Sequence, residues 1–140
     1  GSRLMSNIRE DKGYTYGISS ALMGALNGAY ITIQSQQDHA YTDAVVEETM
    51  KEIERLRTKP MDKDKLERLR AFARSQQAAL LGPPFDISAY HSLRLTTGVP
   101  EGYFKSQQEI INNMTPQSIM ETAYCHINPA QARISIASPS

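Results

Sequence analysis

The sequence predicts an α+β domain in which helices cover one face of a mainly antiparallel sheet. Three observations lead to this class. Two neighbouring segments near the start have strand character, several helix-like segments follow, and a last short segment again has strand character. This order matches a ferredoxin-like βαββαβ unit that lacks its first strand. We expect residues 1–140 to form a single domain, truncated on its N-terminal side because the first strand of such a unit is central.

The chain opens with a short predicted helix that ends at Gly13. Leu4 and Ile8 are four positions apart, which is the spacing of one helical face, and a glycine suits the left-handed residue that terminates a helix. A hairpin follows. Its strands are expected over 14–22 and 29–35, and glycines with an Asn-Gly pair mark the turn between them.

The middle of the chain is predicted to be helical. Expected helices cover 42–57, 62–81, 86–97 and 103–113, and a last helix begins after Thr115. Prolines and glycines separate these segments. Thr42 and Thr115 are the expected N-cap residues, because a hydroxyl oxygen accepts a hydrogen bond from a free amide of the first turn. A short closing strand is expected over 133–138.

Composition argues against several classes of protein. Fifteen basic residues balance fifteen acidic ones, so no net field draws the chain to nucleic acid or to an anionic membrane. Basic residues in 51–74 alternate with acidic ones, which is typical of a solvated helix surface. Cys125 is the single cysteine, which rules out an internal disulfide. No apolar run approaches the roughly 20 residues that span a bilayer.

The junction between the first helix and the first strand carries the candidate binding residues. Arg9 lies in the last helical turn, and Tyr16 lies early in the strand, seven positions later. A guanidinium and a phenol both donate hydrogen bonds without a metal or a cofactor, and a peptide carbonyl accepts them. The structural alternative is that the helix dipole alone favours Arg9 and that Tyr16 is an ordinary strand residue. Tyr14, Tyr16 and Ile18 alternate onto one strand face, and Tyr14 is expected to pack.

No metal site is expected in this chain. His39, His91 and His126 lack the partners that an H-x-x-E-H motif requires. Cys125 and His126 are adjacent, which is poor geometry for two ligands of one metal ion. Nucleotide-binding glycine motifs and the G-x-S-x-G motif of serine hydrolases are also missing from the sequence.

The residues around Arg9 resemble a known family. The stretch 1–16 is similar to the S-R-L-x-x-x-x-R-E-x-x-G-x-x-Y signature of the pitrilysin/insulinase metallopeptidases. The similarity is to the second, non-zinc lobe of the bacterial, processing-peptidase-like branch. Segments 61–68 and 113–129 resemble later parts of the same lobe. The resemblance implies a two-lobed clamshell in which the other lobe carries the zinc motif H-x-x-E-H.

The resemblance also implies a function. The chain would be the substrate-binding half of a zinc-dependent metalloendopeptidase, inactive alone and able to hydrolyse peptide bonds when paired with a zinc-bearing lobe on the same or a separate chain. Arg9 and Tyr16 match the family's arginine and tyrosine that reach the substrate backbone. This chain would contribute no catalytic residue and no cofactor, since the zinc belongs to the partner lobe.

Two alternatives stay open. One is a non-catalytic assembly scaffold of the same fold, and the other is an unrelated α+β peptide-binding domain. The incomplete sheet would also allow a homo-oligomer. The bacterial cytoplasm and periplasm are equally compatible with the sequence.

Overall fold

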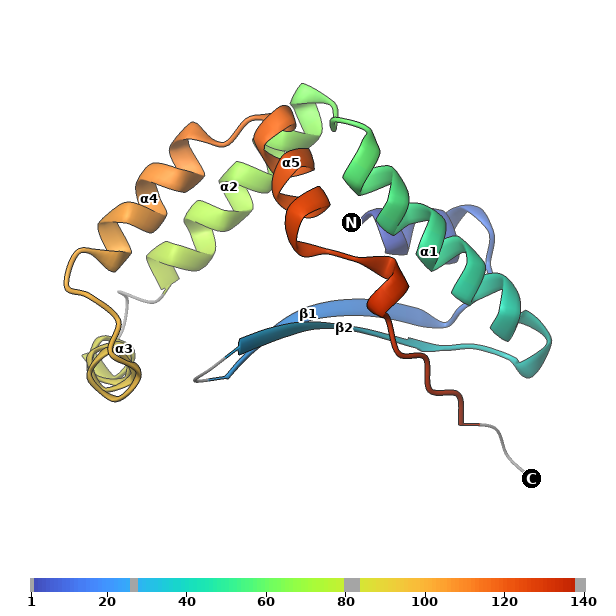
Figure 1. Ribbon diagram of the computed structural model, residues 1–140, viewed down its shortest axis with the longest axis horizontal. Helices are drawn as coiled ribbons and strands as arrows, with labels where there is room; N and C mark the ends of the chain where they lie inside the picture. Colours follow the sequence, from blue (N-terminus) through green and yellow to red (C-terminus); the bar gives the residue numbers. More distant parts are fainter. Residues whose placement is uncertain (1, 26–27, 80–83, 138–140) are drawn as a thin grey trace. The chain divides into compact units, whose positions relative to one another are not determined.

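The chain has an α+β fold, as predicted. The computed structural model describes residues 2–25, 28–79 and 84–137 (Figure 1). Contacts divide the chain into two compact units: 1–59 with 122–140 form the first, and 60–121 form the second. The first unit holds the hairpin and the candidate binding residues, and the second is helical.

The sheet of the first unit is an antiparallel hairpin of β1 (Gly17–Ala25) and β2 (Gly28–Gln36). The two strands pair along their full length. Their bounds differ by a few residues from the predicted ranges 14–22 and 29–35, because β1 starts later and continues through Gly24. The predicted Asn-Gly turn falls partly outside the described residues.

Two helices cover one face of this hairpin, as predicted. A π-helix, η1 (Met5–Asp11), and the α-helix α1 (Thr42–Thr58) lie on the same side of the strands (Figure 1). Ile8 of η1, Ile18 of β1 and Val45 of α1 form the core between them and are 0%, 5% and 4% exposed. The buried contact between sheet and helices is therefore concentrated where β1 begins.

Two helix caps bear on the predictions made from the sequence, and one of those predictions holds. Thr115 Oγ1 accepts from the amide of Ser118 at 3.0 Å, and the Ser118 hydroxyl accepts from the amide of Thr115 at 2.9 Å. This confirms the cap of the last helix. The predicted cap at Thr42 is wrong, because a 3-10 turn, η2 (His39–Tyr41), precedes α1. Asp38 caps that turn by accepting from its first amide at 3.1 Å.

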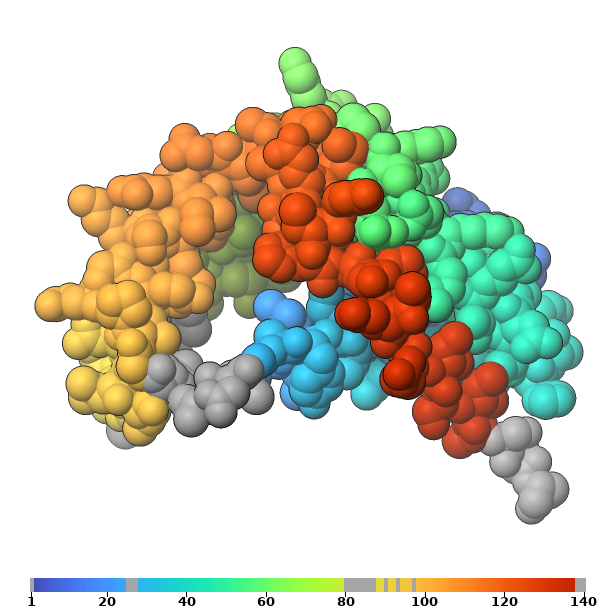
Figure 2. Space-filling model, in the orientation of Figure 1, coloured from blue at the N-terminus to red at the C-terminus, as the bar shows by residue number. Residues whose placement is uncertain are grey.

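The predicted closing strand over 133–138 is wrong for its described residues. The segment 132–137 has no regular secondary structure, and Ile134 and Ile136 are each 56% exposed. Figure 2 shows this segment on the surface. The closing strand of a βαββαβ unit pairs with the first strand, and the described residues contain no such strand. The strand with which 133–137 would pair is therefore missing from the described part of the chain.

The second unit is built from α2 (Lys63–Ala79), α3 (Pro84–Thr97), α4 (Tyr103–Asn113) and the start of α5 (Pro116–His126). These bounds agree with the predicted helices, except that the last residues of the second predicted helix fall outside the described ranges. Leu66 of α2 is buried, whereas Phe72 of the same helix is 61% exposed. None of the helices in the described ranges is long and apolar enough to cross a membrane.

Replacing Ile8 by alanine should lower the free energy of unfolding by about 2–5 kcal/mol, because the substitution leaves a cavity between η1, β1 and α1. Urea denaturation measures the loss. Ile136→Ala is the matched control, since Ile136 is 56% exposed and lies outside regular structure. We expect that variant to stay within about 0.5 kcal/mol of the wild type. Equal losses in the two variants would contradict the core described above.

Candidate functional site

Arg9 lies in the last turn of η1, where the sequence places it, and its side chain is exposed. Within the described residues, its guanidinium has no hydrogen-bonding or ion-pair partner. Its backbone carbonyl is occupied, since it accepts from the amide of Gly13 at 3.1 Å. The backbone of Arg9 is thus held in place, while its guanidinium stays available to a ligand.

The end of η1 reverses the chain directly behind Arg9. Gly13 has a φ of +66°, which confirms the predicted left-handed glycine. The amides of Gly13 and Tyr14 donate to the carbonyls of Arg9 and Ile8, which lie four and six positions earlier. A glycine-terminated α-helix closes with bonds over three and five positions. Each bond here spans one residue more, as expected where the helix has the wider π geometry.

Tyr16 precedes β1, and its side chain is 70% exposed. Its amide donates to the carbonyl of Gln36 at 2.9 Å, which extends the strand pairing by one position. The predicted alternation of Tyr14, Tyr16 and Ile18 onto one face is wrong, because the chain bends at Tyr16 and leaves its side chain exposed, whereas Ile18 lies in the core and Tyr14 packs against it. The phenol has no hydrogen-bonding partner in the described ranges. It is free to donate to a ligand.

Tyr14 packs, as predicted. Its ring stacks on the ring of Tyr41, with centroids 5.3 Å apart and planes 16° from parallel. The ammonium of Lys12 lies 5.9 Å from the centroid of the Tyr14 ring. Tyr14 also packs against the core around Ile8. Of the two tyrosines at this junction, Tyr16 is therefore the one that is accessible.

Thr15 lies between these tyrosines and is 7% exposed. Its Oγ1 accepts from the amide of Gly17 at 3.1 Å, and it lies 2.8 Å from the carbonyl oxygen of Gly17. It also lies 2.8 Å from the hydroxyl oxygen of Ser35 and 2.7 Å from the carbonyl oxygen of Gln36. Thr15 was not among the candidate residues predicted from the sequence. A small polar residue inside a tyrosine-rich segment was the only signal in the sequence.

A second group of polar contacts holds η1 against α1. Lys12 Nζ lies 2.5 Å from Glu48 Oε2, and Asn7 Nδ2 donates to the same carboxylate oxygen at 3.3 Å. Asn7 also donates to Glu52, which is 8% exposed, at 3.0 Å. Asn7 and Lys12 lie on either side of Arg9 in the sequence. The segment that carries Arg9 is therefore fastened to α1 at both ends.

The charges around Glu48 shift its titration. Hydrogen bonds from Lys12 and then Lys51 lower the pKa of Glu48 from 4.5 to about 2, against a smaller opposing effect of desolvation. The hydrogen bonds to Glu47 and Glu48 raise the pKa of Lys51. Glu48 therefore stays ionised well below the pH at which a free glutamate becomes protonated.

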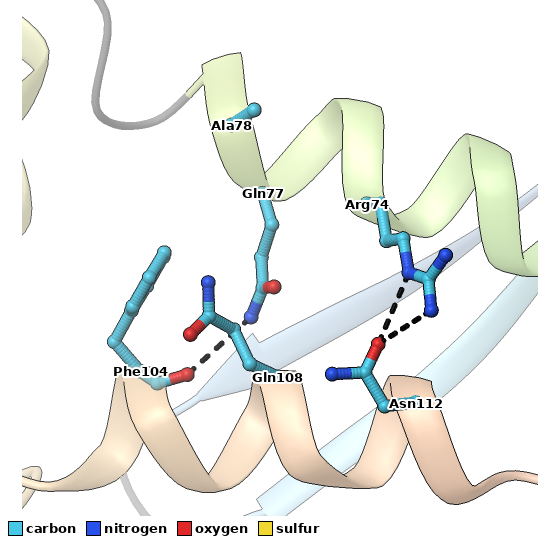
Figure 3. A pocket seen from close by; sticks show the side chains of 6 residues that line it. All are labelled: Arg74, Gln77, Ala78, Phe104, Gln108 and Asn112. Carbon is cyan, nitrogen blue, oxygen red and sulfur yellow. Dashed lines mark hydrogen bonds between the residues drawn. The ribbon is translucent and has the colours of Figure 1, made fainter.

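A hollow of about 330 Å³ lies between α2 and α4 in the second unit (Figure 3). It is lined by Arg74, Gln77, Ala78, Phe104, Gln108 and Asn112. Arg74 donates from two nitrogens to Asn112 Oδ1 at 3.0 and 2.8 Å, and Gln77 donates to the carbonyl of Phe104 at 3.5 Å. Because these groups bridge the two helices, we interpret the hollow as part of their packing. No candidate residue from the sequence lies there.

The histidines are dispersed over separate elements. His39 begins η2, His91 lies in α3, and His126 ends α5. No group of three or more histidine, cysteine, aspartate or glutamate side chains suited to a metal ion occurs within the described ranges. The residues described in this chain therefore do not fit a zinc site.

The sequence profile of the peptidase M16 inactive domain matches residues 1–72, which include both Arg9 and Tyr16. The chain belongs to the peptidase M16 inactive domain family. This confirms the relationship to the non-zinc lobe that the sequence motif indicated.

A solved structure has the same fold as this M16 domain. It is the crystal structure of a peptidase M16 inactive domain from Pseudomonas fluorescens, with a TM-score of 0.79 and 19% sequence identity over 91% of the present chain. The present chain spans 30% of the length of that one. None of the curated proteins matches the present chain.

Stability should depend on pH through Glu48. Its pKa is lower in the folded chain than the ordinary value of 4.5, so the unfolded chain binds more protons between those values and stability rises with pH. The contribution is complete above about pH 4.5 and is lost as the pH falls toward about 2. Urea denaturation across this range measures it, and Glu48→Gln should flatten the curve.

Glu47→Gln is the control for this experiment. The described residues show Glu47 paired with Lys51 at 2.7 Å, and its side chain is 67% exposed. That substitution should leave the pH dependence close to that of the wild type. Superimposed curves for the wild type and Glu48→Gln would rule out a stabilising role for the Glu48 contacts.

Proposed function

We propose that this lobe is the substrate-binding, non-zinc half of a zinc-dependent metalloendopeptidase. One observation carries the proposal. Arg9 and Tyr16 lie at the two ends of one tightly held junction, both are exposed, and neither polar group has a partner within the described residues. Donors without an internal partner are available to an acceptor on a ligand.

A peptide backbone supplies the matching acceptor. A carbonyl oxygen has two lone pairs and can receive hydrogen bonds from the Arg9 guanidinium and the Tyr16 phenol together. When water attacks the carbonyl carbon, negative charge develops on this oxygen, and donors already in position stabilise it. In the proposed enzyme, the other lobe supplies the activated water through its zinc ion. The part of this chain is to bind and orient the peptide.

The hairpin supports binding of an extended substrate. In the described residues, β1 and β2 form a two-stranded sheet, so each strand has one outer edge without a neighbouring strand. Such an edge binds an extended peptide through backbone hydrogen bonds. Recognition of this kind would be directed at the peptide backbone, as is recognition by Arg9 and Tyr16.

The competing function, a non-catalytic scaffold, is favoured by a different surface. Toward the tip of the hairpin, Leu22, Met23, Tyr30 and Ile31 are 72%, 44%, 60% and 48% exposed. Met23 is paired with Tyr30, and Leu22 with Ile31. Successive strand residues point to opposite faces, so the hairpin tip exposes one apolar pair on each face. Exposed apolar side chains of this kind favour contact with another protein. A peptidase lobe also has to meet its zinc-bearing partner, so the hairpin tip alone is compatible with both functions.

The proposal predicts the effect of removing each donor in the complete enzyme, with both lobes present. Arg9→Ala and Tyr16→Phe should each lower kcat by about 10²–10³-fold, the usual cost of losing one donor to a developing oxyanion. Arg9→Lys should not restore the rate, since an ammonium lacks the planar fork of the guanidinium. Cleavage of internally quenched peptides measures these rates.

Matched controls are available in the same chain. Arg68 is an exposed arginine of α2, and Tyr103 is a tyrosine of α4 that is 40% exposed. We expect Arg68→Ala and Tyr103→Phe to leave kcat unchanged. If Arg9→Ala and Tyr16→Phe both retain full turnover, the proposed role is wrong and the scaffold is favoured.

A further inference from the structure

The hydroxyl of Thr15 lies where the two strands of the hairpin meet the end of the η1 turn. It contacts Gly17, the first residue of β1, and Ser35 and Gln36, the last two residues of β2. All of these oxygen–oxygen and nitrogen–oxygen distances lie between 2.7 and 3.1 Å, and Thr15 itself is 7% exposed. A buried hydroxyl needs partners, and this one has them on both strands.

These contacts fix the backbone on both sides of Tyr16. The peptide unit before its Cα is held because the Tyr16 amide donates to Gln36. The peptide unit after its Cα is held because the Gly17 amide donates to Thr15 Oγ1. Peptide units are planar, so holding both of them sets φ and ψ of the residue between them. The direction in which the Tyr16 side chain leaves the backbone is thereby set as well.

We propose that Thr15 is a positioning residue for Tyr16, and that it acts by aiming the phenol at the substrate carbonyl. The inference rests on the proposed function of Tyr16. Thr15 itself touches no substrate. Its β-branched side chain is restricted at χ1, which keeps the oxygen between the two strands. Rates of catalysis depend steeply on such alignment, since a misplacement of 1 Å can cost about 10²-fold.

Two substitutions separate the hydroxyl from the shape of the side chain. Thr15→Val keeps the branched shape and loses the oxygen, whereas Thr15→Ser keeps the oxygen. In the complete enzyme, we expect Thr15→Val to lower kcat by about 10- to 100-fold with little change in KM, and Thr15→Ser to retain most of the activity. Cleavage of internally quenched peptides measures both constants.

A double-mutant cycle distinguishes positioning from a general effect on folding. If Thr15 acts through the phenol, Thr15→Val should cause no further loss in an enzyme that already carries Tyr16→Phe. The same fold loss with and without Tyr16→Phe would overturn the inference. Should Thr15→Val fail to fold, Ser35→Ala replaces it in the cycle, because that variant removes only one of the contacts of Thr15.

The cycle also tells failure of this inference from failure of the proposed function. If Tyr16→Phe alone leaves kcat unchanged, the proposed function fails, and the inference that rests on it fails too. If Tyr16→Phe lowers kcat and Thr15→Val does not, Tyr16 keeps its role and only the positioning by Thr15 is wrong.

Discussion

The candidate site depends on the complete burial of Ile8 between β1 and α1. Full burial of an isoleucine side chain stabilises a fold by about 1.5–3 kcal/mol, but apolar packing of this kind has no direction. The contacts of Asn7 and Lys12 with Glu48 are directional. Packing holds η1 on the sheet, and the polar contacts set its orientation. Arg9, the next residue after Ile8, is carried on the exposed side as a result.

Local pattern was enough to predict most of the elements. The helix α4 (Tyr103–Asn113) has the predicted bounds, because its limits are marked by neighbouring residues in the sequence. The prediction of a closing strand over 133–138 was wrong, since a strand depends on a distant partner whose presence no local pattern reveals. The 3-10 turn before α1 was missed for a smaller reason. Asp38 offers a cap earlier than Thr42 does, and both residue types are good caps.

The same distinction separates the predicted site residues from the missed ones. Arg9, Gly13 and Tyr16 form a local motif, and the positions of the three in the turn follow from their spacing. Thr15 forms a hydrogen bond with Ser35, which is 20 positions away, and Asn7 donates one to Glu52, which is 45 positions away. Such contacts become visible only when the hairpin and α1 are in place. The sequence therefore predicted which groups are presented but not what holds them.

The two proposed donors, Arg9 and Tyr16, differ in the conformational freedom that their side chains keep. The backbones of Arg9 and Tyr16 are both fixed by hydrogen bonds, so the remaining freedom lies in their side chains. A tyrosine has two side-chain torsions to order, whereas ordering an arginine costs up to about 2 kcal/mol of conformational entropy. Tyr16 is therefore the better preorganised donor in the free lobe. In the proposed complex, Arg9 would offset its larger entropy loss with a full positive charge, whose attraction to an acceptor is strongest where water is excluded.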